Sequence, residues 1–261
     1  MGHILLFDVG NTNTKLAITG ADNGFITFSF PTRADSTPDE LGLKILQACQ
    51  YMDIDARLVA AWVVSSVVPC CDALLRDACA RFFSCPLYFV PVDLPLDLEN
   101  QYARPLEVGA DRLATAFAAR RLFADRNLII VDFGTATTVE CVRDNAYLGG
   151  LICPGLLSSL EALGSKTARL PRISLEVEGP ELYFGQSTVQ SMNLGMVHGF
   201  SAMITGLTEK IRHKVGPALV VATGGHARKI AAVCEAIDEV RGDLLFYGLQ
   251  TVWQENCPDG K

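Results

Sequence analysis

The sequence predicts a duplicated α/β protein. The main observation is a pattern that occurs twice, in residues 4–18 and 128–139: an apolar run ends in an acid, a polar corner with a glycine follows, and an apolar-rich run resumes. Such a pattern is typical of strand, tight turn and strand. Apolar segments of helical length follow each copy. Because more than a hundred residues separate the two corners, we infer that one α/β unit has been duplicated.

Composition limits the classes of protein to consider. The chain has 261 residues, of which 49% are hydrophobic and 20% charged, so we expect a globular protein, divided into two domains. The net charge of -7 and the scattered basic residues argue against a sequence-independent nucleic-acid surface. No apolar run approaches the roughly 18 to 20 residues of a membrane-spanning helix. The first residues resemble a core strand rather than a secretion signal, and therefore we expect a cytoplasmic location.

The first corner carries groups suited to phosphate oxygens. Gly10 permits close backbone approach, and Lys15 adds a point charge. Amides and hydroxyls come from Asn11, Thr12, Asn13 and Thr14. Asp8 would repel a phosphate unless a divalent cation lay between them, and Mg²⁺ is commonly held by a carboxylate together with phosphates. A nucleotide site fits these residues, but an ordinary hairpin with a polar turn facing water fits them equally well.

The second corner favours the nucleotide interpretation. Asp132, Gly134 and Thr135 repeat the order of acid, glycine and hydroxyl after a buried run. Two such corners at the ends of core strands suggest that the halves of the fold face each other across a nucleotide.

Between the corners the sequence predicts alternating strands and helices. Thr37 is a good N-cap for a helix that begins at Pro38, with Glu40 three residues after the cap. Ser65 and Ser66 end a buried strand, where they either contact a ligand or cap the next helix. The expected strands are residues 25–30, 58–64 and 87–90, and the expected helices are residues 38–51, 70–83 and 113–123.

A proline-rich segment leads into the last of these helices. Gly109 and Asp111 stand at its amino end, where free N–H groups and the helix dipole favour anions. Asp111 alone would be an ordinary helix-start acid. The neighbouring Arg112 and the preceding loop with Tyr102 favour a catalytic role, although Arg112 also fits a surface salt bridge.

The second half repeats this arrangement. Thr188 lies near the start of a long helix, as a cap or as a ligand contact. Gly224 and Gly225 fit either close approach of a base or sugar, or a simple tight turn. His226 has no spaced partner and is interpreted as a surface or helix-start residue. The expected strands are 128–132, 137–142, 146–152 and 218–222, and the expected helices are 153–163, 185–214 and 244–253.

Taken in order, these motifs resemble those of type III pantothenate kinases, a family in the superfamily of acetate and sugar kinases, heat-shock chaperones and actin. The resemblance rests on residues 8–13, 109–112, 132–138, 149–150, 154–155, 170–171, 185–188, 191–192 and 223–225. It implies two ribonuclease-H-like (actin-like ATPase) domains with mixed sheets flanked by helices, expected at 1–113 and 114–257, the second with a dimer helix. It also implies an ATP-dependent kinase that phosphorylates the primary hydroxyl of pantothenate to 4'-phosphopantothenate, the first step of coenzyme A biosynthesis.

The resemblance also assigns roles to residues. Asp111 matches the catalytic base, Asp132 the ligand of a monovalent cation, K⁺ or NH₄⁺, and Thr135 an ATP contact. The first phosphate loop comprises Asp8, Val9, Gly10, Asn11, Thr12, Asn13, Thr14 and Lys15, with Asp8 near Mg²⁺. The pantothenate contacts are Tyr102, Gly109, Ala110, Asp111, Arg112 and Thr188. A homodimer is implied, with the acceptor site near the subunit interface.

Two other functions remain to be distinguished from this one. A nucleotide-dependent regulatory protein would keep the two corners but lack acceptor chemistry, and the presence of Asp111 beside Arg112 argues against it. A kinase of the same superfamily that acts on a sugar or a short carboxylic acid would share all the nucleotide motifs.

Overall fold

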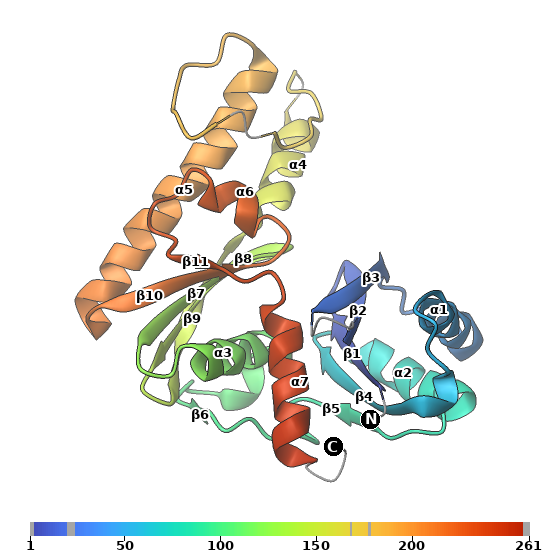
Figure 1. The fold of residues 1–261 in the computed structure, drawn as a ribbon. Coiled ribbons are helices and arrows are strands. Elements are labelled where there is room, and N and C mark those ends of the chain that lie inside the picture. Colours follow the sequence, from blue (N-terminus) through green and yellow to red (C-terminus); the bar gives the residue numbers. More distant parts are fainter. Residues whose placement is uncertain (1–2, 20–23, 168, 177–178, 258–261) are drawn as a thin grey trace. The chain divides into compact units, whose positions relative to one another are not determined.

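The structure is a computed structural model that describes residues 3–19, 24–167, 169–176 and 179–257. The chain divides into two compact units (Figure 1). The first unit takes its residues from the spans 1–98, 104–118 and 243–261, and the second from 99–103 and 119–242. The division falls within helix α3 (Ala110–Leu122). These units are interleaved in sequence, whereas domains were expected as contiguous halves; the domain limits at 113 and 257 stay a prediction.

The first unit contains a five-stranded mixed sheet with the order β3-β2-β1-β4-β5. β1 is antiparallel to β2 and parallel to β4, so the first corner joins two neighbouring central strands. The strands are β1 (His3–Val9), β2 (Asn13–Thr19), β3 (Phe25–Pro31), β4 (Val59–Ser66) and β5 (Leu87–Phe89).

The second unit contains a six-stranded sheet with the order β11-β10-β7-β8-β9-β6. Apart from β6, its strands follow one another in space as those of the first sheet do, with β7 in the place of β1. This correspondence confirms the expected duplication. The strands are β6 (Glu99–Asn100), β7 (Asn127–Phe133), β8 (Ala136–Arg143), β9 (Ala146–Pro154), β10 (Ala218–Thr223) and β11 (Glu239–Val240).

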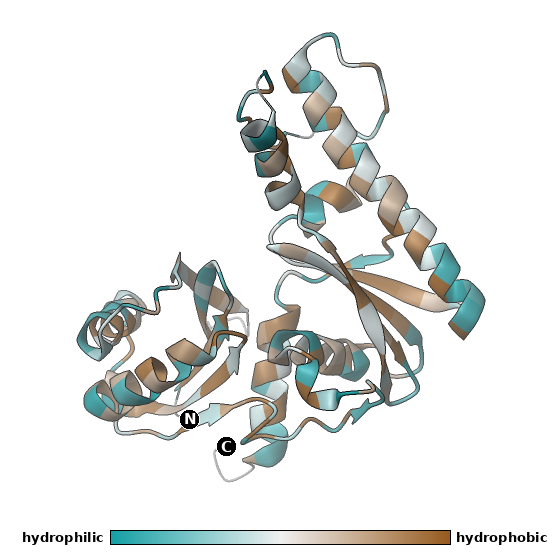
Figure 2. Cartoon of the chain, turned by 180° about the vertical axis from the view of Figure 1, so that it is seen from behind, coloured by the Kyte–Doolittle hydropathy of each residue, from teal (hydrophilic) through white to brown (hydrophobic). Residues whose placement is uncertain are grey.

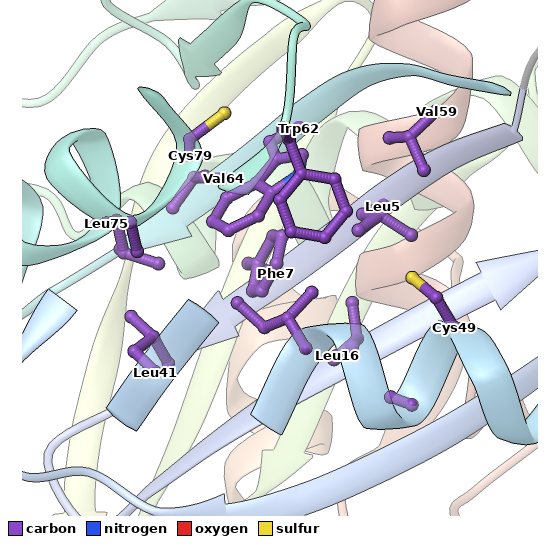
Figure 3. Packing of buried hydrophobic residues seen from close by; sticks show 14 of the residues in the cluster. Leu5, Phe7, Leu16, Leu41, Cys49, Val59, Trp62, Val64, Leu75 and Cys79 are labelled. Atoms are coloured by element: carbon purple, nitrogen blue, oxygen red, sulfur yellow. The ribbon is translucent and has the colours of Figure 1, made fainter. Parts of the chain in front are cut away.

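Helices cover both faces of the first sheet. α1 (Pro38–Tyr51) and α2 (Pro69–Phe82) pack over one face, where the rings of Phe7 and Trp62 lie 4.7 Å apart (Figure 3). α1 begins as expected, because the Thr37 hydroxyl accepts a hydrogen bond from the backbone N–H of Glu40. Two short 3-10 helices, η1 (Ala56–Leu58) and η2 (Pro105–Glu107), lie in the loops.

The other face of the first sheet packs against α3 and the C-terminal helix α7 (Leu244–Asn256). Leu6 of β1, Phe117 of α3 and Leu249 of α7 belong to one buried cluster. The two helices approach closely at Gly248, where a Cβ atom would lie 2.5 Å from the backbone oxygen of Ala114. The face of α3 that follows Asp111 is therefore anchored to the sheet.

In the second unit, one sheet face packs against α4 (Leu156–Lys166), α5 (Thr188–Val215) and α6 (Ala227–Ala231). Because Cys153 and Pro154 still belong to β9, α4 begins later than the expected residue 153. The long helix α5 is confirmed, although it begins at Thr188 rather than at the expected residue 185. In Figure 2 it alternates between hydrophobic and hydrophilic colours, and its carboxyl end is hydrophilic, where Arg212, His213 and Lys214 stand.

None of the helices within the described residues combines the length and the apolar character needed to cross a membrane. The cysteines are free thiols. Cys49, Cys141 and Cys234 are buried, and Cys153 is half-buried.

Candidate active site

The first corner places an acid and a base opposite each other. Asp8 pairs with Lys15 across the antiparallel strands β1 and β2. Lys15 Nζ lies 3.2 Å from Asp8 Oδ2, and the exposed fractions of the two side chains are 46% and 18%. The backbone N–H of Gly10 closes the turn by donating to the Asn13 carbonyl at 3.1 Å. The corner is thus a tight turn with an accessible ion pair at its base.

A neighbouring threonine holds this turn in place. Thr32 Oγ1 donates to the Gly10 carbonyl at 2.7 Å, and its own backbone N–H donates to the Thr12 carbonyl at 3.0 Å. The hydroxyls of Thr14 and Thr32 lie 2.9 Å apart, and Thr14 is buried. The exposed polar residues of the turn are Asn11, Thr12 and Asn13. Thr14 therefore supports the loop from inside, while the other three present their side chains to solvent.

The two serines at the end of β4 have different environments. Ser66 Oγ donates to Asp72 Oδ1 at 2.6 Å, in the first turn of α2. The residue at the N-cap position of α2 is Val68, so Ser66 supports the helix start without capping it. Ser65 pairs with Asp8 across the parallel strands. Its hydroxyl is buried and has no hydrogen-bond partner among the described residues.

The start of α3 lies at the same edge of the first unit. The backbone N–H of Val67 donates to the Val9 carbonyl at 3.0 Å, which fixes the segment after β4 beside the end of β1. A Cβ atom on Gly109 would lie 3.3 Å from Val67 Cγ1 and would overlap Asp111 Oδ1. Gly109 therefore allows α3 to begin close to the first corner.

Asp8 and Asp111 consequently share one edge and one face of the first unit. Leu6 packs on the face covered by α3, and side chains alternate along a strand, so Asp8, two residues later, is on that face. Asp111 stands in the first turn of α3. Its Oδ1 accepts from the backbone N–H of Arg112 at 2.8 Å, which orients the carboxylate. Two of the acids expected at one site thus stand at the same end of the first sheet, and a shared site stays a prediction.

The second corner is one residue shorter than the first. Asp132 pairs with Thr138 across its hairpin, and Asp8 pairs with Lys15 across the other. The first hairpin therefore has one more residue between the acid and its partner. The parallel neighbour of Asp132 is Thr223 on β10, in the place that Ser65 has beside Asp8. The two corners therefore share an architecture and differ in the side chain opposite the acid.

Two glycines allow the second corner to pack tightly. Gly224 has φ +89°, and a Cβ atom there would overlap Asp132 Oδ1 and approach the Phe133 backbone at 2.8 Å. A Cβ atom on Gly155 would overlap the Thr135 carbonyl, which also accepts a hydrogen bond from Ser158 at 2.9 Å. The glycine at the end of β10 thus makes close contact with the acid, which agrees with the tight-turn alternative.

Tyr102 is held against the β8–β9 hairpin. Its ring lies against Gly149, where a Cβ atom would lie 3.4 Å from Tyr102 Cδ2, and its centroid is 6.4 Å from that of Tyr147. The Tyr102 backbone N–H donates to Asn100 Oδ1 at 3.0 Å.

Thr188 is the first residue of α5 and does not cap it. The cap is Ser187, whose hydroxyl accepts from the backbone N–H of Gln190 at 3.2 Å. Thr188 is exposed and lines an open hollow of about 730 Å³. The hollow is also lined by Leu163, Leu170, Gly185 and Met192. The capping alternative for Thr188 is therefore wrong, and a ligand contact stays a prediction.

His226 stands at the N-cap position of α6, as the helix-start interpretation expected. It is half-buried, and its Nδ1 atom has no hydrogen-bond partner among the described residues. Burial lowers the pKa of His226 below its usual value, and the positive charge of Lys229 lowers this pKa further.

Comparison with known proteins identifies the family. A sequence model described as type III pantothenate kinase matches residues 4–210. The chain belongs to this kinase family. A type III pantothenate kinase of Nitratidesulfovibrio vulgaris (strain DP4) is 51% identical over 97% of this chain and 98% of its own length. That of Oleidesulfovibrio alaskensis (strain ATCC BAA-1058 / DSM 17464 / G20) is 48% identical over 97% of both chains.

A solved structure supports the fold of this kinase. The crystal structure of MreB 5 of Spiroplasma citri, bound to AMPPNP, has a TM-score of 0.58 and 9% sequence identity, and the match covers 100% of this chain and 98% of that one. At this identity the likeness shows the fold alone. It confirms the expected actin-like architecture of two mixed sheets flanked by helices.

Sequence reasoning missed several supporting residues of the kinase. Thr32 holds the first turn, but it lies 22 residues from Gly10 and no local pattern links them. Glu140 is a buried acid within strand β8. Its position among apolar residues was the one sequence signal that could have pointed to it, because a buried acid needs a partner. In the described part of the chain, no three His, Cys, Asp or Glu side chains gather into a metal site.

Proposed function

We propose that this kinase transfers the γ-phosphoryl group of ATP to the primary hydroxyl of pantothenate, giving 4'-phosphopantothenate in the first step of coenzyme A biosynthesis. Family membership over residues 4–210 carries the proposal. The geometry of the first unit supports it, because Asp111 and the Asp8 corner share one edge. Phosphoryl transfer requires an acceptor oxygen held in line with the phosphate, and a carboxylate beside the phosphate loop can hold it.

Asp111 is the proposed catalytic base. Its carboxylate, oriented by the Arg112 backbone N–H, accepts or orients the proton of the pantothenate hydroxyl. Arg112 is proposed to offset negative charge on the pantothenate carboxylate or the transferring phosphate. Gly109 and Ala110 add contacts at the start of α3, and Tyr102 and Thr188 complete the proposed acceptor site.

The first corner is the proposed phosphate loop. Its exposed amides and hydroxyls, together with backbone N–H groups, are suited to phosphate oxygens. The whole loop is Asp8, Val9, Gly10, Asn11, Thr12, Asn13, Thr14 and Lys15, in which the buried Thr14 acts through its contact with Thr32. Lys15 is proposed to exchange its bond with Asp8 for one with a phosphate. Asp8 fits Mg²⁺, since its carboxylate is partly exposed beside this turn. Bound Mg²⁺ neutralises charge on the phosphates.

The second corner is proposed to bind ATP through Thr135 and a monovalent cation, K⁺ or NH₄⁺, through Asp132. Asp132 Oδ1 lies in a cradle beside Gly224 that a side chain would fill, and oxygen ligands suit such a cation. A bound monovalent cation supplies positive charge near the nucleotide. The MreB relative was crystallised with AMPPNP, a nucleotide bound by the same fold.

We also propose a cytoplasmic homodimer that binds neither nucleic acid nor membrane. Several large apolar side chains at the end of the second unit support the dimer, because a monomer leaves them in water. Leu182 and Phe184 are 72% and 93% exposed, and Leu157, Leu163 and Val189 are also exposed.

An ADP-release assay tests the reaction. The purified chain is assayed with ATP, Mg²⁺ and one acceptor at a time: pantothenate, a panel of sugars, or acetate. ADP release that requires pantothenate, and falls when Na⁺ replaces K⁺, is the expected result. Release with a sugar or acetate instead would support the rival kinase. Nucleotide binding without release for any acceptor would support the regulatory protein.

A further inference from the structure

Tyr147, whose ring lies beside that of Tyr102, belongs to a buried hydrogen-bonded pair. Tyr147 Oη donates to Glu140 Oε2 at 2.6 Å, and Tyr147 and Glu140 have exposed fractions of 0% and 1%. Val139 faces the core formed by α4, α5 and α6, so Glu140, the next residue on β8, faces the opposite side of the sheet. The phosphate loop and the Asp111 region do not include this pair.

The backbone of β9 is irregular where Tyr102 contacts it. The pairing of β8 with β9 shifts between Cys141 and Val142, which leaves Leu148 as an extra residue. The next residue, Gly149, has φ +116°. Such bulges re-aim side chains and often lie next to active sites. Here the bulge lies between Tyr147, which donates the hydrogen bond to Glu140, and Gly149, against which the ring of Tyr102 packs.

The segment before Tyr102 is docked on the same strand. The backbone N–H groups of Glu99 and Gln101 donate to the carbonyls of Asn145 and Tyr147, both at 2.9 Å. Tyr147 therefore contacts the Tyr102 segment twice, through its carbonyl and through its ring. A shift of the Tyr147 ring would move the surface against which Tyr102 lies.

We propose that Glu140 and Tyr147 are positioning residues for the acceptor: their buried hydrogen bond fixes the Tyr147 ring, which fixes Tyr102. This inference rests on the proposed function, in which Tyr102 contacts pantothenate. Neither residue touches the reacting atoms. Their effect therefore belongs to the KM for pantothenate rather than to kcat.

The test is a double-mutant cycle with Tyr147→Phe, Tyr102→Ala and the two combined. Tyr147→Phe keeps the ring and removes the hydrogen bond, so we expect the KM for pantothenate to rise about 3- to 10-fold, with kcat and the KM for ATP unchanged. In the Tyr102→Ala background the same change should have no further effect on this KM. Tyr51→Phe, which removes an exposed hydroxyl in the first unit, is the matched control.

A merely structural role would give a different pattern. An unchanged pantothenate KM in Tyr147→Phe, an equal rise in both KM values, or a rise that persists without Tyr102 would each overturn the inference. Should Tyr147→Phe fail to fold, Gly149→Ala tests the same placement through a second contact of the Tyr102 ring, with the same expected rise and the same dependence on Tyr102. Glu140→Gln keeps an acceptor for the Tyr147 hydroxyl and should preserve the pantothenate KM better than Tyr147→Phe does.

The unmodified chain separates the two possible failures. If it releases ADP no faster with pantothenate than without, the proposed function fails and this inference fails with it. If it responds to pantothenate and Tyr147→Phe responds identically, only the inference fails.

Discussion

Asp8 and Asp132 occupy matching places in the two sheets, yet their neighbours differ. Lys15 stands across the hairpin from Asp8, and Thr138 stands across from Asp132. The positive side chain of Lys15 beside Asp8 suits the proposed phosphate loop, because a flexible lysine side chain can exchange the Asp8 carboxylate for a phosphate. The duplicated positions have therefore acquired separate chemical roles in this proposal.

The base assignment makes a prediction for Asp111. Asp111→Asn should lower kcat by about 10² to 10⁴, because an amide cannot accept the hydroxyl proton. ATP affinity, measured by calorimetric titration, should not change. Asp39→Asn is the control, since Asp39 is also a first-turn acid in the first unit but forms an ion pair with Arg81. Unchanged turnover in the Asp111 variant would contradict the assignment.

The lowered pKa of His226 predicts that the stability of the fold depends on pH. Burial lowers its pKa in the folded state, so below about pH 6.5 the unfolded chain binds more protons than the folded chain. Its contribution to stability is therefore present above that pH and is lost as the pH falls through the lowered pKa. His226→Gln should weaken this acid destabilisation. Thermal unfolding of both proteins between about pH 7.5 and 5 measures it; parallel pH profiles would rule it out.

The turn after β10 explains why two adjacent glycines are not equivalent. A Cβ atom on Gly224 would overlap Asp132, whereas a Cβ atom on Gly225 would meet none of the described residues within 4 Å. The sequence pair could not show which glycine is required, because the contact joins two strands some ninety residues apart.

These two glycines form a matched pair for mutagenesis. Gly224→Ala should lower the free energy of unfolding by about 1–3 kcal/mol, because its φ is positive and the added Cβ atom would meet both Asp132 Oδ1 and the Phe133 backbone. It should also weaken the activation by K⁺ through displacement of Asp132. Gly225→Ala should change neither quantity appreciably. Urea unfolding and the K⁺ dependence of ADP release measure both. Similar losses in the two variants would show that the turn, rather than the Asp132 contact, is sensitive.

Most elements could be predicted because their signals are local. Thr37, Pro38 and Glu40 specify the start of α1 within four residues, and apolar runs mark β1 and β7. The two-residue strands β6 and β11 were missed, because two residues are too few to show a period. The start of α4 was predicted too early, because Pro154 was interpreted as a helix start, whereas it is the last residue of strand β9.

The candidate site was predictable to a similar extent. The acids at both corners and at the start of α3 follow recognisable runs. Their supports do not: Thr32, Gly155 and the pair of Glu140 and Tyr147 act through contacts with distant segments. Local patterns predict which residues stand at strand ends, whereas tertiary packing decides which of them hold the others in place.

The proposed dimer can be tested through the exposed apolar residues of the second unit. Leu182→Glu combined with Phe184→Glu should shift the protein towards a monomer, because an interface that buries two unpaired carboxylates is unfavourable. Sedimentation velocity of the parent chain should show a dimer. Val92→Glu, a change at an apolar residue of the first unit that is 82% exposed, is the control and should remain dimeric. A parent chain that sediments as a monomer would refute the proposal.

The return of α7 to the first sheet affects the order of events during synthesis. Leu249 and Val252 of this helix complete the buried cluster that begins at Ile4 and Leu6. One face of β1 must therefore stay exposed during synthesis until residues 244–256 have emerged from the ribosome. Maturation of the first sheet thus depends on α7, and a chaperone that shields nascent apolar surface would act during that interval.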